Sequence, residues 1–336
     1  MNFNKLKKRA FLALISFAVL FLLYFLVYIF SPANKVDALV TIEIQKGIGF
    51  RQVNSILAEA GLVRHPFLFH LLALGNRATG RIKAGEYELS RTLSPWEILR
   101  KLVRGEVRAF MITVLEDSTV RDVLERLVSY RLVDPGEFMR LAYDQEFLRL
   151  LGIEGSSVEG YLFPDTYKLD RTMGSERIIR SMVGEFWKSI TPEMRSQLPR
   201  LGFSFTEIVI LASMIGKETG YAMEKPYVSA VFHNRLKKGM KLQSDPTAVY
   251  NLENFSGKIR RRHLKSETPH NTYRINALPP TPIGNPGVDS IKAAIYPAQV
   301  NYLYFVSKND GSHNFSETFQ DHRQSIIKYQ VNKGKY

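Results

Sequence analysis

One glutamate stands where the pattern of its helix calls for an apolar residue. In SFTEIVILASMIGKETGYAMEK (residues 204–225), Ile208, Leu211 and Ile215 recur at spacings of three and four, which predicts one buried face of a helix. The next position on that face is Glu218. Gly220 follows as a stop signal, so we expect Glu218 to occupy the last helical turn.

This placement gives Glu218 the properties of a general acid. The negative end of the helix macrodipole and partial burial both disfavour the ionised carboxylate, and so both raise its pKa. A carboxyl group that is still protonated near neutral pH can give its proton to a leaving group. The helix alone leaves another interpretation open, a frayed end with Glu218 turned to solvent near Lys217 or Lys225.

The residue types for other common chemistries are missing or badly spaced. The sequence holds no cysteine, which excludes disulfides, thiolate metal sites and a cysteine nucleophile. The histidines form no HExxH pattern or close pair, and there is no GxSxG elbow or phosphate-binding loop. We therefore expect neither a metal nor a cofactor.

The N-terminal residues predict a membrane anchor. Residues 10–30 form an apolar run, interrupted only by Ser16, that is long enough to cross a bilayer as a helix. Basic residues precede the run and no acidic residue occurs before Asp37, so the positive-inside rule places residues 1–9 in the cytoplasm. A cleaved signal peptide is the alternative, but its apolar region spans only about 7–15 residues. We expect an uncleaved single-pass membrane anchor, with a linker at 31–38 and the rest outside the cytoplasm.

The charge balance is consistent with an anionic partner. Lys and Arg number 46 against 32 Asp and Glu, a net charge of +14. Such a surface suits nucleic acid, lipid headgroups or an acidic polymer. Because most of the chain is expected outside the cytoplasm, we expect no nucleic acid partner.

Residues 39–143 contain one pattern twice. Residues 40–63 and 112–134 each predict a strand, a turn and a helix, and a second predicted helix follows in both. The first copy closes with a predicted strand at 81–90, and strand–helix–helix–strand is a small α+β module suited to binding. Five identities recur at a constant offset: Arg51/Arg121, Val53/Val123, Leu57/Leu127, Leu62/Leu132 and Val63/Val133.

The C-terminal half predicts a second, larger assembly of elements. We expect helices at 174–190, 206–218 and 226–238, a Pro/Gly-rich segment at 278–287, a hairpin that begins with a strand at 302–306, and a final helix at about 317–330. Within QSDPTAVY (243–250), Asp245 as N-cap and Pro246 at the first helical position predict a short helix.

Several longer motifs resemble the endolytic murein transglycosylase family, also called YceG-like. They are EGYLFPDTY (159–167), KET (217–219), VFHNRLKKGMKLQSDPTAVY (231–250), HNTYR (270–274), LPPTPIGNPG (278–287) and YLYFV with H.FSET (302–318). The resemblance implies an inner-membrane protein of α+β class. It would have an N-terminal transmembrane helix, LysM-like βααβ modules at 39–143 and a mixed α/β catalytic domain at 144–336.

The resemblance also implies a reaction and a site. The catalytic glutamate of the family falls on Glu218 through the KET motif. The implied reaction is internal cleavage of MurNAc–GlcNAc bonds in nascent peptidoglycan strands to 1,6-anhydro-MurNAc ends, with Glu218 as acid and then as base. Peptidoglycan strands are the implied substrate, and peptidoglycan synthases are candidate partners. Four residues are candidates for sugar contacts: Gln243, Asp245, Asn271 and Tyr273.

Three positions depart from the family pattern. His270 stands where tyrosine is usual, and Ala277 and Thr281 stand where glycine is usual. They lie in the expected wall of the cleft and concern substrate detail. Two alternative functions remain, a non-catalytic peptidoglycan-binding scaffold of the wall-synthesis machinery, and a muramidase that uses Glu218 with Asp245 as a hydrolytic pair.

Overall fold

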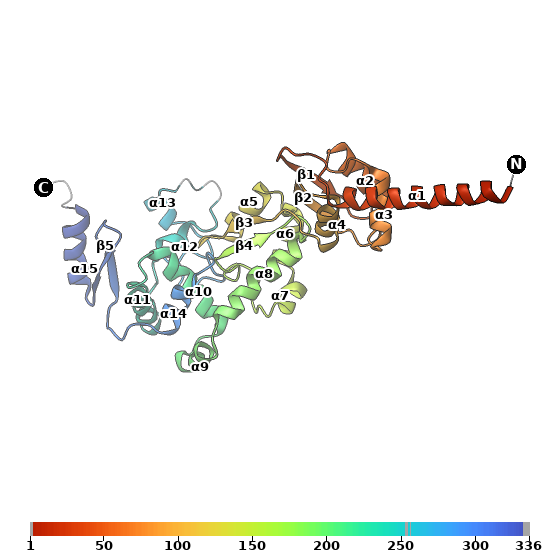
Figure 1. Cartoon of the computed structure of the whole chain (residues 1–336). Coiled ribbons are helices and arrows are strands. Elements are labelled where there is room, and N and C mark those ends of the chain that lie inside the picture. Colours follow the sequence, from red (N-terminus) through yellow and green to blue (C-terminus); the bar gives the residue numbers. More distant parts are fainter. Residues whose placement is uncertain (1–2, 253–254, 256, 332–336) are drawn as a thin grey trace. The chain divides into compact units, whose positions relative to one another are not determined.

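The computed structural model describes residues 3–252, 255 and 257–331. These residues form two compact units of mixed α+β structure (Figure 1). The first unit contains the residues up to 110 together with 170–172, and the second contains the other residues from 111 onward. Residues 1–2 of the expected cytoplasmic tail and residues 332–336 of the expected catalytic range lie outside the described residues.

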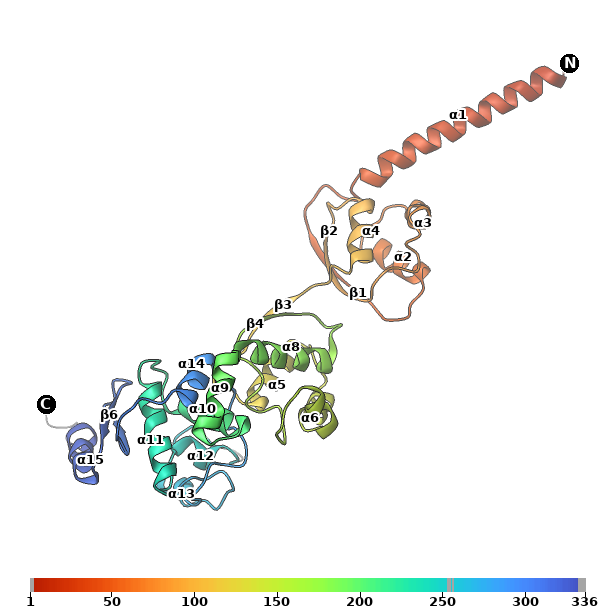
Figure 2. The ribbon, with the colours of Figure 1, turned by 90° about the horizontal axis from the view of Figure 1, so that it is seen from below.

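The first unit is a two-stranded antiparallel sheet covered by short helices (Figure 2). The register places Ile42 opposite Tyr87, and both side chains are buried with Leu57, Phe69 and Ile98 from the three helices. This alternation of buried strand residues is the pattern of a sheet with one face on a core. Its elements are α1 (Phe3–Phe30), β1 (Leu39–Ile44), α2 (Phe50–Glu59), α3 (Pro66–Gly75), β2 (Gly85–Ser90) and α4 (Pro95–Arg104).

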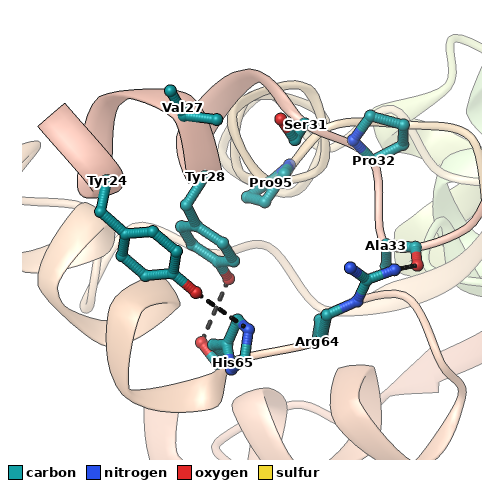
Figure 3. A pocket seen from close by; sticks show the side chains of 9 residues that line it. All are labelled: Tyr24, Val27, Tyr28, Ser31, Pro32, Ala33, Arg64, His65 and Pro95. Atoms are coloured by element: carbon teal, nitrogen blue, oxygen red, sulfur yellow. Dashed lines mark hydrogen bonds between the residues drawn. The ribbon is translucent and has the colours of Figure 1, made fainter.

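The apolar helix α1 is joined to this unit by more than the chain. Its stretch Lys7–Phe30 is long and apolar enough to cross a membrane. Its C-terminal end, however, belongs to the core of the first unit: Tyr28 is buried, and its hydroxyl donates a hydrogen bond to the carbonyl oxygen of His65 at 3.1 Å (Figure 3). Arg64 donates to the carbonyl oxygen of Ala33 at 2.6 Å. The predicted linker at 31–38 is therefore held against the module at Ala33.

The second unit is built around one central helix, α10, whose residues 208–216 are all buried. Helices α11 and α14 pack on it. Its strands are β3 (Phe110–Thr113), which starts at the boundary between the units, β4 (Thr166–Leu169), β5 (Tyr304–Ser307) and β6 (His313–Ser316). Its helices are α5 (Val120–Ser129), α6 (Pro135–Ala142), α7 (Gln145–Leu150), α8 (Gly174–Ser189), α9 (Pro192–Leu201), α10 (Phe205–Glu218), α11 (Lys225–Lys237), α12 (Asp245–Val249), α13 (Arg261–Leu264), α14 (Val288–Ile295), α15 (Phe319–Ile326) and a π-helical turn (Ile327–Val331).

The two sequence repeats contain strands and helices in the same order. In the first, β1 and β2 pair around α2 and α3; in the second, β3 and β4 pair around α5, α6 and the additional α7. The turn after the first strand has a left-handed residue in both copies, Gly47 (φ +89°) and Asp117 (φ +62°). The second copy belongs to the second unit, so the division between units falls inside the range 39–143. The repeated apolar positions that are buried in both copies are Val53/Val123, Leu57/Leu127 and Leu62/Leu132.

Two local predictions have different outcomes. The C-terminal hairpin is confirmed, because β5 and β6 pair antiparallel with Phe305 opposite Phe315. The predicted N-cap of α12 was wrong. Ser244 is the N-cap residue and Asp245 is the first helical residue. The hydroxyl of Ser244 makes no capping bond, because it is turned toward α10 instead.

Candidate active site

Glu218 is the last residue of α10, and its surroundings follow from how that helix begins and ends. A capping box between Ser204 and Glu207 starts the helix. The backbone turns to an extended conformation at Thr219, which ends it. The partly buried carboxyl group of Glu218 accepts a hydrogen bond from the Ser244 hydroxyl, with 2.5 Å between Oγ and Oε1. Glu218 is thus tied to α12 and not turned out to solvent.

These surroundings raise the pKa of Glu218 to about 7. Burial is the largest cause, and the negative charge of Asp245 raises the pKa further. The hydrogen bond from Ser244 and the positive charge of Arg235 act in the opposite direction, because both favour the carboxylate. A carboxyl group with this pKa is present in both forms near neutral pH, so it can give a proton and take one back.

Arg235 on α11 fixes the loop that leads to Ser244. Its side chain is 6 % exposed, and its guanidinium donates to the carbonyl oxygens of Leu242 (2.8 Å) and Leu303 (2.7 Å). Gln243 lies at the end of this loop in a left-handed conformation (φ +51°), with its side-chain oxygen 3.5 Å from Arg235 Nη1. The backbone N–H of Ser244 donates to the Thr272 hydroxyl (2.9 Å), which joins this loop to the segment 270–274.

The segment 270–274 contributes Tyr273 to the site and uses Asn271 for its own structure. The hydroxyl of Tyr273 donates to Asp245 Oδ1 at 2.6 Å, beside Ser244. Asn271 is fully buried, and its amide group donates to the carbonyl oxygens of Ser266 (2.6 Å) and Leu264 (3.1 Å). Three of the four predicted sugar contacts (Gln243, Asp245 and Tyr273) therefore lie on the segments around Ser244, whereas Asn271 orders the loop behind them.

Two of the three departures from the family pattern contact each other. His270 Nε2 and the Thr281 hydroxyl are 2.7 Å apart, and Nδ1 lies 2.9 Å from the amide nitrogen of Asn251. Burial lowers the pKa of His270 to about 4, so the ring is neutral at neutral pH. A neutral ring accepts from Asn251 at Nδ1 and donates to Thr281 at Nε2. The third departure, Ala277, is exposed and lines a different groove with Phe203 and His233.

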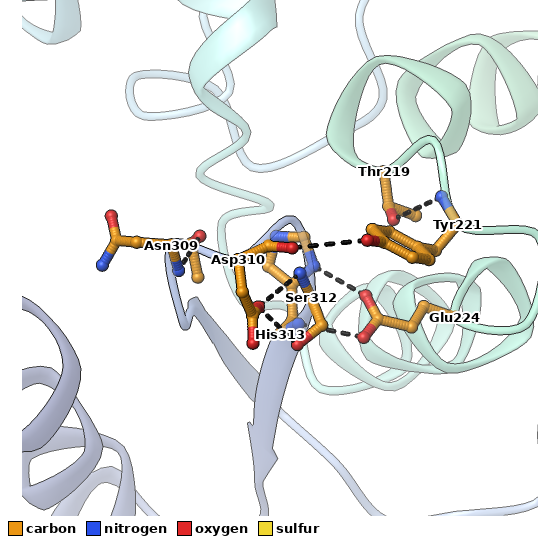
Figure 4. A network of polar contacts seen from close by, with 8 residues as sticks. Thr219, Tyr221, Glu224, Asn309, Asp310, Ser312 and His313 are labelled. Atoms are coloured by element: carbon orange, nitrogen blue, oxygen red, sulfur yellow. Dashed lines mark hydrogen bonds and ion pairs between the residues drawn. The ribbon is translucent and has the colours of Figure 1, made fainter.

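The C-terminal hairpin holds the loop that follows Glu218. Glu224 accepts a hydrogen bond from the backbone N–H of His313 (2.9 Å) and lies 2.8 Å from its ring Nδ1 (Figure 4). Tyr221 donates to the carbonyl oxygen of Asp310 at 3.3 Å. Both contacts join residues that are about ninety positions apart in the sequence. They restrict the path of the chain just after Glu218.

A second buried acid was not anticipated from the sequence. Glu159, in the EGYLFPDTY motif, is 3 % exposed, and burial raises its pKa to about 7. It accepts hydrogen bonds from the Tyr250 hydroxyl (2.7 Å), the Val120 N–H (3.0 Å) and the Asn285 amide (3.2 Å). Ser244 was also missed, because its role arises only when α12 packs against α10. The sequence motifs indicated both segments, 159–167 and 243–250. They did not indicate that Glu159 and Ser244 are the residues that make these contacts.

The structure thus places a carboxyl group of raised pKa, that of Glu218, at the end of a buried helix in an α+β fold. The chain belongs to the YceG-like family, whose pattern it matches over residues 42–328. It is 28 % identical over 312 residues to the endolytic murein transglycosylase of Bacillus subtilis (strain 168), covering 88 % of this chain and 86 % of that one.

Two further similarities come from other organisms. An endolytic murein transglycosylase of Streptococcus pneumoniae serotype 2 is 26 % identical in an alignment of 343 positions, gaps included, that covers 90 % of this chain and 61 % of that longer protein. The crystal structure of a YceG-like protein from Listeria monocytogenes aligns with a TM-score of 0.59 at 29 % identity, over 86 % of this chain and all of that chain.

Proposed function

We propose that this chain is a membrane-anchored endolytic lytic transglycosylase that cleaves MurNAc–GlcNAc bonds in peptidoglycan, with Glu218 as its single acid–base group. The relatives that carry the name endolytic murein transglycosylase support the enzyme class. The observation that carries the role of Glu218 is its carboxyl group with a pKa of about 7 at the end of α10.

The reaction proceeds in two proton transfers. Protonated Glu218 gives its proton to the glycosidic oxygen while the bond from that oxygen to C1 of MurNAc breaks, and an oxocarbenium-like centre develops at C1. The C6 hydroxyl of the same MurNAc then attacks C1, and the Glu218 carboxylate takes the hydroxyl proton. The products are a free GlcNAc 4-hydroxyl and a 1,6-anhydro ring, so no water is consumed and Glu218 regains its starting state.

The neighbours of Glu218 suit both half-reactions. The Ser244 hydroxyl donates to Oε1, which leaves Oε2 as the oxygen that carries the transferable proton. After the transfer, the same hydrogen bond stabilises the carboxylate. Burial and the negative charge of Asp245 both favour the protonated form of Glu218, and the Asp245 charge also favours a positive centre on the sugar.

We propose Gln243, Asp245 and Tyr273 as sugar contacts. The hydrogen bond from Tyr273 to Asp245 orients one carboxylate oxygen and leaves the other for a sugar hydroxyl. Gln243 is held by the Arg235 loop on the other side of Ser244. We assign Asn271 to the support of this loop, because its side chain is fully buried and already hydrogen-bonded.

The first repeat is proposed as a LysM-like site that binds peptidoglycan. It has a pocket of about 190 Å³, lined by the turn at residues 44–48 together with Thr79, Gly80 and Ile82. The equivalent turn of the second repeat, at 114–118, is packed against α10, since Asp117 contacts the backbone at Gly216. Binding within the range 39–143 is therefore assigned to the first repeat. The helix α1 is proposed as the inner-membrane anchor, with its basic N-terminal side in the cytoplasm.

Mass analysis of the products from purified glycan strands tests this function. The full-length protein should release long fragments that end in 1,6-anhydro-MurNAc, lighter by one water than hydrolysis products. Reducing ends would instead support a muramidase that pairs Glu218 with Asp245. Binding of strands with no cleavage by the folded protein would support the scaffold function. Short products released only from strand ends would contradict endolytic cleavage.

A further inference from the structure

The turn at residues 116–118 of the second repeat lies between the Pro/Gly-rich segment 278–287 and the end of α10 that carries Glu218. A Cβ atom added at Gly216 would lie 2.0 Å from Asp117 Oδ1, and one added at Gly284 would lie 2.6 Å from the Asp117 carbonyl oxygen. The backbone N–H of Asp117 donates to the carbonyl oxygen of Asn285 at 2.8 Å. Glycines at these two positions therefore make room for the turn.

Asp117 is an unfavourable residue for the place it occupies. Its φ of +62° is in the left-handed region, where the equivalent residue of the first repeat is Gly47. Its carboxylate is largely buried, and Oδ1 has no hydrogen-bond partner among the described residues. Burial raises its pKa to about 6. Glycine would adopt the left-handed backbone without strain and would bury no carboxylate. The fold itself therefore does not explain an aspartate at this position.

The charged groups around Asp117 indicate what the carboxylate does. Lys217 and Lys225 both lie close enough to lower its pKa, while Glu116 acts in the opposite direction. Lys225 is already paired with Glu116, at 3.2 Å. Lys217 lies over Gly284, where an added Cβ would be 3.0 Å from its Cε, and its charge also acts on buried Glu159. The same added Cβ would lie 2.6 Å from the Asp117 carbonyl oxygen, so the Lys217 side chain lies beside the Asp117 turn, and its charge acts on Asp117 and Glu159.

This placement matters because Lys217 is the sequence neighbour of Glu218. The groups that face Glu218 from other elements are Ser244, Asp245, Arg235 and Tyr273. An ammonium group that joined them would favour the carboxylate, and Glu218 would then lose its proton at lower pH. We propose that Asp117 is a positioning residue that, with Glu159, holds Lys217 away from the Glu218 carboxyl group. This inference rests on the proposed acid role of Glu218.

The experiment compares full-length wild type with Asp117→Gly, Asp117→Asn and the double variant Asp117→Gly/Lys217→Met. In both single variants we expect the basic limb of the pH–rate profile to shift to lower pH by about one unit. At pH values above the limb, this shift lowers the rate about tenfold. Asp117→Asn keeps the size and backbone tolerance of the residue and removes only its charge. The double variant should regain the wild-type limb, because it has no ammonium group to release.

The fold should not suffer from the glycine substitution. We expect the Tm of Asp117→Gly to equal that of wild type or to exceed it by about 2–4 °C, because the residue no longer strains the backbone. A clear fall in Tm would show that Asp117 is structural and overturn the proposal. A wild-type pH profile in both single variants would overturn it too, and so would a double variant that keeps the shifted limb.

A direct titration separates this inference from the proposed function. The ¹³C signal of the Glu218 carboxyl group, assigned by its loss in Glu218→Gln, reports the same shift without any glycan. Suppose that wild type cleaves no strands but that the pKa of Glu218 is about one unit lower in Asp117→Gly than in wild type. The proposed role of Asp117 toward Lys217 is then supported, and the proposed activity is wrong. An unshifted titration in an active series overturns the role of Asp117 alone.

Discussion

Replacing Glu218 by glutamine is expected to stabilise the fold by an amount that depends on pH. The pKa of this carboxyl group rises from 4.5, its ordinary value, to about 7 in the folded protein. The folded protein therefore binds this proton more tightly than the unfolded chain does. The bound proton stabilises the fold fully below pH 4.5, and this contribution is lost as the pH rises through 7. A shift of roughly 2.5 units at about 1.36 kcal/mol each gives about 3 kcal/mol. Residual contact of the side chain with water reduces this to about 2 kcal/mol.

Urea unfolding of the full-length protein at pH 4 and pH 8 measures this difference. Relative to wild type, Glu218→Gln should gain about 2 kcal/mol more at pH 8 than at pH 4. Glu176→Gln is the matched control, because Glu176 is exposed on α8 and its pair with Arg180 is a surface contact worth little. If the two substitutions change stability equally at both pH values, Glu218 is not a buried acid of raised pKa and the description of the site is wrong.

Three further results are expected. Ser244→Ala removes the hydrogen bond that favours the Glu218 carboxylate, so the basic limb of the pH–rate profile should rise by about one to two units; an unchanged limb would contradict that contact. Asn285→Ala leaves the N–H groups of Gly160 and Leu162 without their buried acceptor, and urea unfolding should show a loss of about 3 kcal/mol or more. Chains that start at residue 24 or at residue 34 should both leave the membrane fraction. The shorter one should melt at lower temperature because it lacks Tyr28; equal melting would contradict that packing.

Patterns that depend on local chemistry were predictable from the sequence. The apolar spacing along residues 208–215 and Gly220 predicted a buried helix with Glu218 in its last turn, and α10 ends at that residue. The repeated Leu57 and Leu127 predicted related units, and both are fully buried. In each case the residues that determine the structure lie within one helix, so the spacing of apolar residues along the sequence is enough to predict it.

Features that depend on contacts between distant segments were not predictable in this way. Ser244 and Asp245 are both good N-cap residues, and local rules cannot choose between them. In the structure Ser244 is the N-cap residue, and its hydroxyl donates to a glutamate twenty-six positions earlier, a contact that local spacing does not show. Asp117 likewise looks like an ordinary turn residue until the fold places it against Gly216. The pairing of His270 with Thr281 also joins two substitutions that seem unrelated in sequence.

Comparison of wild type with Glu218→Gln on purified glycan strands tests the central claim most directly. Glutamine keeps the shape and the acceptor for Ser244, but it cannot give or take the proton. General acid–base assistance is typically worth about 10²–10⁴-fold, and one residue serves both steps here, so we expect a loss at the upper end of that range. Wild type should form anhydro-MurNAc ends, and Glu218→Gln, folded and still bound to strands, should form none within the detection limit. Equal yields of anhydro ends from the two proteins would contradict the account.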